Sequence, residues 1–291
     1  MSNGFPGSKA WAVALAAAAL FAGGAAVAAE GQPVPWQLGL QPAASPIAAQ
    51  IDQFHDFLLY IITAITLFVL GLLIYVMVRF NERANPEPSK LTHNTGLEVA
   101  WTLIPVVILI VIAIPSFRLL FDQYTFPKAD VTIKAIGNQW YWTYEYPDAD
   151  DMTFDSLMVE DADLKPGQPR LLTVDNEVVV PVNKNVHVLV TATDVLHNWA
   201  MPAFGVKLDA VPGRVLKTWF RAEKTGMFYG QCSELCGVRH AFMPIAVRVV
   251  SESEYEAWLE TAKKQFASKP RVPAPDADPD GQAERISVAR N

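Results

Sequence analysis

A short stretch in the C-terminal part of the chain carries four side chains that bind soft metal ions. Cys232 and Cys236 are the only two cysteines, and His240 and Met243 follow them closely. His197 lies upstream, where an earlier strand or loop could bring it alongside. Thiolate, imidazole and thioether ligands together favour copper over magnesium or calcium. Two cysteines with two histidines suit a pair of copper ions bridged by sulfur better than a single ion.

Three other interpretations of these residues are open. An exported domain would allow a Cys232–Cys236 disulfide, but that bond would close a very short loop and leave the histidines and the methionine unexplained. A zinc ion could bind two cysteines and two histidines, yet it has no use for Met243. Two buried cysteines without a ligand would be inert small hydrophobes. The softness of the whole set favours copper over all three.

The N-terminal part of the 291-residue chain predicts a targeting segment. Residues 1–29 contain one lysine, an alanine-rich apolar run and a small-x-small sequence at Ala26-Val27-Ala28. These features predict a secretory signal peptide. A third membrane helix is the alternative, but the alanine and glycine content makes the run only weakly hydrophobic. Residues 30–54 form a lead-in rich in proline, glutamine and glycine, without periodicity.

Two more strongly apolar runs predict a transmembrane hairpin over residues 55–120. Segments 57–78 and 99–117 carry no charge, and each is close to the roughly 20 residues needed to cross the hydrocarbon core. The connecting loop contains basic residues, whereas aspartates precede the first span. The positive-inside rule therefore puts the loop in the cytoplasm and both termini outside.

Residues 121–266 change to the pattern of an exported β domain. Short segments separated by Gly, Pro, Asn and Asp predict an antiparallel sandwich or barrel. A helix then begins with a capping box at Ser251 or Ser253 and runs to about Phe266. Residues 267–291 are rich in proline and aspartate and predict a mobile tail. The predicted strands cover residues 131–136, 177–180, 186–190, 215–220, 227–230 and 245–250.

The hairpin, the β domain and the motif Cys-Ser-Glu-Leu-Cys-Gly-x-x-His-Ala-x-Met-Pro closely resemble subunit II of the haem-copper cytochrome c oxidases. The resemblance covers roughly residues 36–266, and the α-proteobacterial members look nearest. It implies that the exported domain carries the dinuclear copper A centre. The expected fold is a two-helix transmembrane hairpin plus an all-β cupredoxin-like sandwich domain.

The resemblance also assigns a role to each residue of the motif. The two cysteines would be bridging thiolates, each histidine would bind one copper, and the methionine would be a weak ligand. Glu234 would bind copper through its backbone carbonyl, and its side chain would reach a magnesium or manganese ion at the interface with subunit I, since a carboxylate is a hard oxygen ligand. A solvated glutamate is the alternative for that side chain. The implied copper ligands are His197, Cys232, Glu234, Cys236, His240 and Met243.

A second group of residues is the aromatic segment 137–146. Its five aromatic side chains would usually pack in a core, but the resemblance makes the first tryptophan, Trp140, the point of electron entry. The family usually has histidine at the position of Asn138.

Acidic residues follow this segment, with no lysine or arginine before Lys165. Such a run is most often a solvated loop, but the resemblance implies a basic partner, cytochrome c, whose encounter complementary charge would steer. The net charge of −7 is unsuited to nucleic acid. The residues expected to dock cytochrome c are Glu145, Asp148, Asp150, Asp151, Asp155, Asp194 and Asp209.

The implied function is that of the electron-entry subunit of a terminal respiratory oxidase. Copper A would accept single electrons from cytochrome c and pass them to haem, which is expected in subunit I only, where oxygen is reduced to water with proton pumping. Subunits I and III and membrane lipid would be partners, in the bacterial inner membrane with the C-terminal domain in the periplasm. Glu98, at the cytoplasmic start of the second span, would lie at the mouth of a proton path or be a simple interfacial charge.

Other functions compete with this one. Copper A domains also occur in nitrous and nitric oxide reduction, but nitrous oxide reductase lacks the anchoring hairpin. A membrane-tethered copper carrier needs an exchangeable site rather than one with six ligands. Quinol oxidase subunit II lacks the cysteines and histidines of the loop and is excluded.

Overall fold

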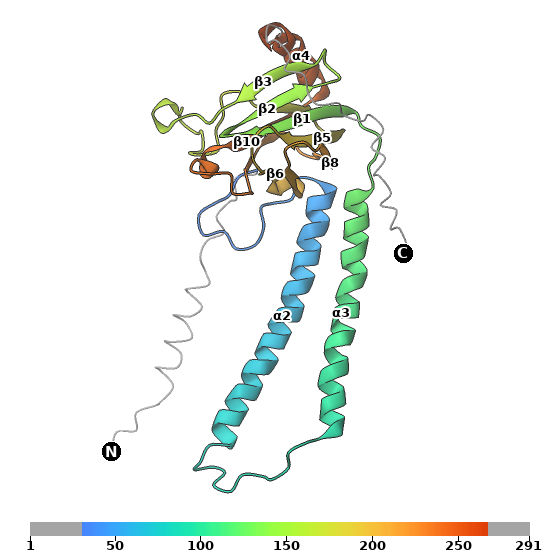
Figure 1. Cartoon of the computed structure of the whole chain (residues 1–291), viewed down its shortest axis with the longest axis vertical. Coiled ribbons are helices and arrows are strands. Elements are labelled where there is room, and N and C mark those ends of the chain that lie inside the picture. The colour runs from blue at the N-terminus through green and yellow to red at the C-terminus, as the bar shows by residue number, and fades with distance from the viewer. Residues whose placement is uncertain (1–30, 267–291) are drawn as a thin grey trace, which may run out of the picture.

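The computed structural model describes residues 31–266, so the signal peptide expected at 1–29 and the tail expected at 267–291 lie outside the described residues. Two long helices run side by side below a β domain and are joined at the end far from it (Figure 1). α2 spans Pro46–Arg79 and α3 spans Thr95–Tyr124. Both are long and apolar enough to cross a membrane.

The predicted spans 57–78 and 99–117 lie inside these two helices, which continue past the apolar stretches. Ser45 is the N-cap of α2, where its hydroxyl accepts a hydrogen bond from the Ala48 N–H at 3.1 Å. The same hydroxyl donates to the Phe204 carbonyl of the β domain at 2.8 Å. An N-cap of this kind stabilises a helix by about 1 kcal/mol. One side chain therefore both starts α2 and joins it to the domain above.

The β domain is a sandwich of short strands. One sheet has five strands in the order β3-β2-β1-β5-β8, a second has three in the order β4-β10-β9, and β6 pairs with β7. The strands are β1 Val131–Asn138, β2 Tyr141–Tyr146, β3 Met152–Ser156, β4 Val178–Pro181, β5 Asn185–Ala192, β6 His197–Met201, β7 Val206–Ala210, β8 Leu216–Arg221, β9 Gly226–Gln231 and β10 Pro244–Val250.

Two strand pairs correct the expectation of a purely antiparallel sandwich. β1 pairs with β5 and β4 pairs with β10 in parallel, whereas the remaining pairs are antiparallel. Long connections separate the members of each parallel pair along the chain, and parallel pairing requires such connections. Periodicity reports which face of a strand is buried, and it carries no information on direction.

The aromatic segment forms β2 and supplies much of the core. Alternation buries Trp142, Tyr144 and Tyr146 and leaves the residues between them partly exposed. The Tyr146 hydroxyl donates to the Val179 carbonyl of β4 at 3.0 Å, which satisfies its polar group inside the sandwich. Burial of each large side chain contributes about 1.5–3 kcal/mol. Trp142, the first of the three, also packs edge-to-face against His197, with ring centroids 6.0 Å apart.

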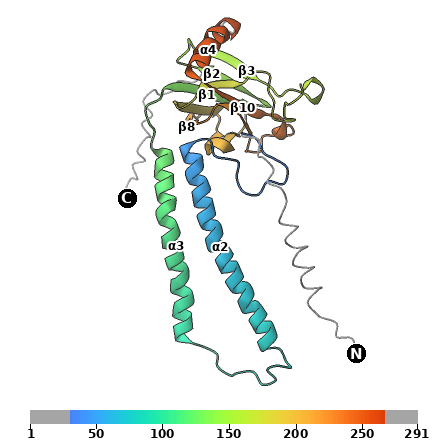
Figure 2. The same ribbon diagram turned by 180° about the vertical axis from the view of Figure 1, so that it is seen from behind.

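α4 (Glu252–Phe266) covers the face of the domain opposite the two long helices (Figure 2). Its N-cap is Ser251 rather than Ser253: the Ser251 N–H donates to Glu254 Oε2 at 2.9 Å, and the Glu254 N–H donates to Ser251 Oγ at 3.3 Å. This reciprocal pair is a capping box. The helix packs through Phe266, whose ring centroid is 4.8 Å from that of Phe154.

Candidate metal centre

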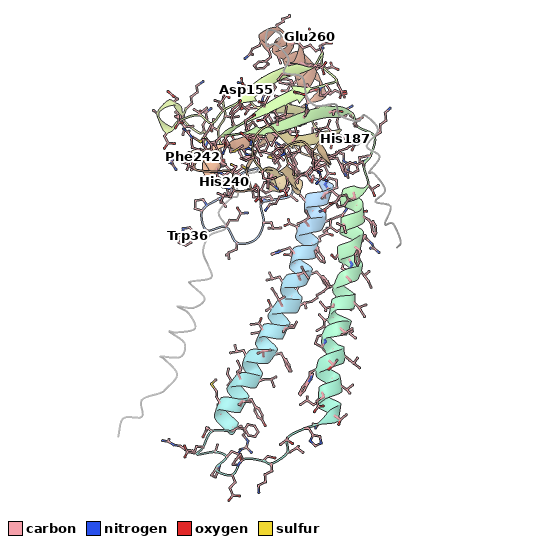
Figure 3. The ribbon with its side chains drawn as sticks, in the orientation of Figure 1. Trp36, Asp155, His187, His240, Phe242 and Glu260 are labelled. Carbon is pink, nitrogen blue, oxygen red and sulfur yellow. The ribbon has the colours of Figure 1, made fainter. Side chains whose placement is uncertain are left out.

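Neighbouring strands bring the sulfur and imidazole groups to one edge of the sandwich. His197 is the first residue of β6, and the cysteines lie in the loop that joins β9 to β10. Because β9 and β10 pair antiparallel, the two ends of this loop meet, and the Cys232 N–H donates to the Met243 carbonyl at 3.4 Å. His240 begins the short 3-10 helix η3 (His240–Phe242), on the part of the domain nearest the lead-in loop (Figure 3).

One half of the centre is built around Cys232. Its Sγ lies 3.9 Å from His197 Nδ1 and 3.3 Å from the Glu234 carbonyl oxygen. His197 is fully buried and Cys232 nearly so. A thiolate, an imidazole nitrogen and a carbonyl oxygen therefore converge in a space shielded from water.

The other half is built around Cys236. Its Sγ lies 3.5 Å from His240 Nδ1 and 3.5 Å from Met243 Sδ. Met243 is buried and His240 is half-buried. Each sulfur thus has its own imidazole and one weaker donor, which is a carbonyl on one side and a thioether on the other.

The separation of the two sulfurs shows that the cysteines are not bonded to each other. Their Sγ atoms are 3.9 Å apart, whereas a disulfide bond measures about 2.05 Å. A metal–thiolate bond of about 2.3 Å lets one ion contact both sulfurs at this separation. The ligand atoms of His197, Cys232 and Cys236 all lie within 4.8 Å of one another, and His240 contacts this trio through Cys236. The donors fit two soft ions along the sulfur pair better than one.

The two thiols differ strongly in acidity. Burial by itself would raise the pKa of Cys232, but hydrogen bonds with His197 and with the backbone of Asn198 and Glu234 lower it to about 7. Burial raises the pKa of Cys236, and the adjacent Cys232 thiolate raises it further, to about 12. Two thiolates side by side repel, so positive ions are needed to hold both in that form.

His197 is held from two sides. A Cβ atom at Gly137 would lie 2.7 Å from the ring Cδ2, so glycine is what lets the imidazole pack against β1. On the other side Nε2 lies 2.9 Å from Asp194 Oδ1. Burial by itself would lower the pKa of His197, but interactions with Cys232 and Asp194 raise it. The ring therefore presents Nδ1 to the sulfur in one orientation.

Trp140 lies against the cysteine loop and is half-buried. Its indole N–H donates to the Cys236 carbonyl at 3.1 Å, and the side-chain amide of Gln139 donates to the same oxygen at 2.8 Å. A Cβ atom at Gly237 would lie 2.9 Å from Trp140 Cζ2, so this glycine makes room for the indole. Sequence reasoning did not identify Gln139, because an amide in a turn carries no signal of a contact nearly one hundred residues away.

The acidic residues expected to dock cytochrome c do not form one patch. Asp148, Asp150 and Asp151 lie in the turn after β2, which is the end of that strand opposite Trp140, and its six residues span roughly 20 Å. There Asp150 Oδ2 pairs with Lys263 of α4 at 2.8 Å. These three carboxylates are therefore distant from the cysteine loop.

The other expected docking residues lie closer to the centre or are paired. Asp155 on β3 is opposite Thr143 of β2, near the end of that strand that follows Trp140, and its Oδ1 accepts a hydrogen bond from the Thr143 hydroxyl at 2.8 Å. Glu145 Oε2 pairs with Lys134 at 3.1 Å. Asp209 Oδ1 accepts a hydrogen bond from Asn198 Nδ2 at 2.6 Å. Asp194 contacts His197, as described above.

Two further glutamates named from the sequence lie away from the sulfur pair. The side chain of Glu234 is exposed on the cysteine loop, and only its carbonyl faces Cys232. Glu98 lies in the first turn of α3, where its Oε1 accepts a hydrogen bond from the Asn94 N–H at 3.3 Å. Glu98 thus closes the cap of α3 at the end of the hairpin far from the β domain.

Comparisons with known proteins agree with this architecture. Residues 131–250 match the family model described as the periplasmic domain of cytochrome c oxidase subunit II, and residues 33–119 match its transmembrane domain. The chain is similar to a probable cytochrome c oxidase subunit 2 of Rickettsia bellii, with 55% identity over 237 residues that cover 81% of this chain and 88% of the relative. It is also similar to cytochrome c oxidase subunit 2 of Cereibacter sphaeroides, with 50% identity over 86% of this chain and 90% of the relative.

A solved structure of similar sequence is the periplasmic domain of subunit II of cytochrome oxidase from Bradyrhizobium japonicum. It is 65% identical and covers 49% of this chain and 99% of its own, with a TM-score of 0.46. The family models and the full-length relatives confirm the resemblance, including two apolar helices followed by a β sandwich. This chain belongs to the cytochrome c oxidase subunit II family, in which a transmembrane domain is followed by a periplasmic domain.

Proposed function

We propose that this chain is the electron-entry subunit of a terminal respiratory oxidase and that it holds a dinuclear copper A centre. The observation that carries the proposal is a pair of buried, unbonded sulfurs 3.9 Å apart, each with its own imidazole. When bound, the copper pair would supply a redox centre that takes single electrons from cytochrome c and gives them to haem in subunit I. The proposed ligands are His197, Cys232, the Glu234 carbonyl, Cys236, His240 and Met243.

The protein's part in this chemistry is to hold the ligands still. Cys232 and Met243 are joined by a backbone hydrogen bond across the closed end of β9 and β10. His197 stands on β6, which contacts β9 and is buried along its whole length. A rigid scaffold of this kind fixes the ligand positions, so little rearrangement accompanies a change of charge. Burial of the sulfurs also excludes water from the site.

Trp140 offers a route from the protein surface to the centre. Part of its ring is exposed, and its N–H bonds directly to the backbone carbonyl of Cys236, a proposed copper ligand. A flat, polarisable ring at the surface suits contact with the exposed edge of a haem in cytochrome c. We therefore assign electron entry to Trp140.

The proposal extends to the rest of the complex. The exposed carboxylate of Glu234 would bind magnesium or manganese at the interface with subunit I, where oxygen is reduced to water with proton pumping. Glu98 would lie at the entrance of the proton path, and membrane lipid would surround the hairpin. The location would be the bacterial inner membrane, with the β domain in the periplasm, as the description of the matching family model supports.

Copper loading should release more protons per chain at roughly pH 6 than at roughly pH 8. The Cys232 thiol, with a pKa of about 7, is protonated at the lower pH and largely ionised at the higher one. The raised pKa of His197 acts in the same direction. Ligands must lose their protons to bind metal. Titration calorimetry in two buffers of different ionisation heat measures the protons released, and equal release at both pH values would contradict the lowered pKa of Cys232.

Asp155→Asn should slow association with cytochrome c more than Asp150→Asn does. Both changes remove one negative charge, but Asp150 lies at the end of β2 that is far from Trp140. Its separation from Trp140 exceeds the Debye length of about 10 Å at 0.1 M salt, so its charge is largely screened there. Stopped-flow rates over a salt series measure the effect, and Asp155→Asn should also flatten the salt dependence. The copper spectrum should not change in either variant. An equal or larger effect of Asp150→Asn would show that docking does not centre on Trp140.

A further inference from the structure

Both oxygens of the Asp194 carboxylate make hydrogen bonds, one of them to a proposed copper ligand. Its Oδ1 lies 2.9 Å from His197 Nε2 and accepts a hydrogen bond from the Val195 N–H at 2.6 Å. Its Oδ2 accepts one from the Gln139 N–H at 2.7 Å. The side chain is 30% exposed, compared with 84% for Asp150 and 56% for Asp161. Asp194 is therefore built into the fold, unlike the acids that project into solvent.

These contacts fix both the orientation and the tautomer of His197. Both oxygens of this carboxylate accept hydrogen bonds from backbone N–H groups, so the carboxylate also serves as the acceptor for the Nε2–H of His197. The lone pair is then on Nδ1, which is the nitrogen that faces Cys232 Sγ. In a metal site, the hydrogen bond of one ring nitrogen sets which nitrogen binds the metal.

We propose that Asp194 is a positioning residue of the copper centre, which acts through His197. The proposal rests on the copper site proposed above. The Gln139 N–H contributes to this positioning, because it bonds Asp194 to the turn between β1 and β2 that also contains Trp140. The entry residue and the histidine ligand are thus fixed to each other through one carboxylate.

The chemistry gives this arrangement two measurable consequences. A carboxylate that accepts the Nε2–H makes the imidazole a stronger electron donor, and this stabilises the more highly charged, oxidised form of a bound copper. Loss of the carboxylate should therefore raise the reduction potential. It should also weaken copper binding, because removal of a carboxylate partner from a ligating histidine lowers metal affinity roughly 10–100-fold.

The test compares Asp194→Ala, Asp194→Asn and the control Asp161→Asn in the full-length chain, purified in detergent and loaded with copper. Asp161 is an exposed acid paired with Arg170, so its replacement removes the same charge without a contact to any ligand. Copper affinity is measured by competition with a chelator, and the potential by spectroelectrochemical titration. Far-ultraviolet circular dichroism verifies folding.

We expect Asp194→Ala to lower copper affinity roughly 10–100-fold, to raise the potential and to alter the histidine couplings in the electron paramagnetic resonance spectrum. Asp194→Asn keeps an acceptor oxygen but lacks the charge, so it should raise the potential with a smaller loss of copper affinity. If the alanine variant does not fold, the asparagine variant alone tests the role of Asp194. Asp161→Asn should match wild type. Wild-type affinity, potential and spectrum in the Asp194 variants would overturn the inference, even if association with cytochrome c slowed. A wild-type chain that binds no copper would instead overturn the proposed function.

Discussion

Replacement of Cys232 or Cys236 by serine should abolish the dinuclear copper spectrum and lower oxidase turnover by more than about 100-fold, the upper end of what the loss of an outer partner costs. Each sulfur lies within 3.9 Å of the other and of an imidazole nitrogen, so either change removes a donor from both halves of the site. Serine is also a hard ligand and a poor bridge between soft ions.

Ser233→Ala provides the matched control for the cysteine variants. Ser233 lies in the same loop, is exposed and donates its hydroxyl to the Gln231 carbonyl at 3.3 Å. Its loss should leave copper content, spectrum and turnover near wild type. A Cys232→Ser protein that kept the complete dinuclear spectrum would show that the sulfurs do not bridge.

Trp140→Gln should slow electron transfer within the docked complex by a large factor, with little change in the affinity for cytochrome c. The substitution removes the exposed ring that a haem edge would contact, whereas the surrounding charges that steer the encounter remain. Transfer from the copper centre onward to haem should be unchanged, because none of the proposed copper ligands is altered. Laser-flash kinetics time these steps separately.

Trp140→Phe separates the two features of this residue. Phenylalanine keeps an aromatic surface but loses the N–H that donates to the Cys236 carbonyl. A near-normal rate in this variant would assign the effect to ring contact, and a rate as slow as that of Trp140→Gln would assign it to the hydrogen bond. If Trp140→Gln itself injected electrons at the wild-type rate, Trp140 would be only a packed aromatic.

The membrane spans could be predicted because an uninterrupted apolar run of this length rarely forms anything other than a transmembrane helix. The ends of the helices that lie nearest the β domain could not be predicted in the same way. α2 begins at Pro46 because Ser45 bonds both to Ala48 and to Phe204, and the second of these is a contact with a distant part of the chain. β6 also escaped prediction, since all five of its residues are buried and it shows no alternation.

The copper motif could be predicted because its ligands lie close together in sequence and their chemical softness is distinctive. Those residues that orient the ligands were harder to identify. Asp194 precedes His197 by three positions, and the sequence led us to expect it only as a docking residue for cytochrome c. Gln139 meets Asp194 across 55 residues, and Gly137 matters only because the imidazole packs against its backbone. Such contacts depend on the pairing of strands, which the sequence pattern does not specify.

The most direct test of the central proposal is the copper content of the full-length chain, measured together with its electron paramagnetic resonance spectrum. We expect two coppers per chain and a spectrum in which one unpaired electron is shared equally between them, since two sulfurs 3.9 Å apart can bridge both ions. A single copper with an unshared electron, bound zinc, or an oxidised Cys232–Cys236 pair without metal would contradict it.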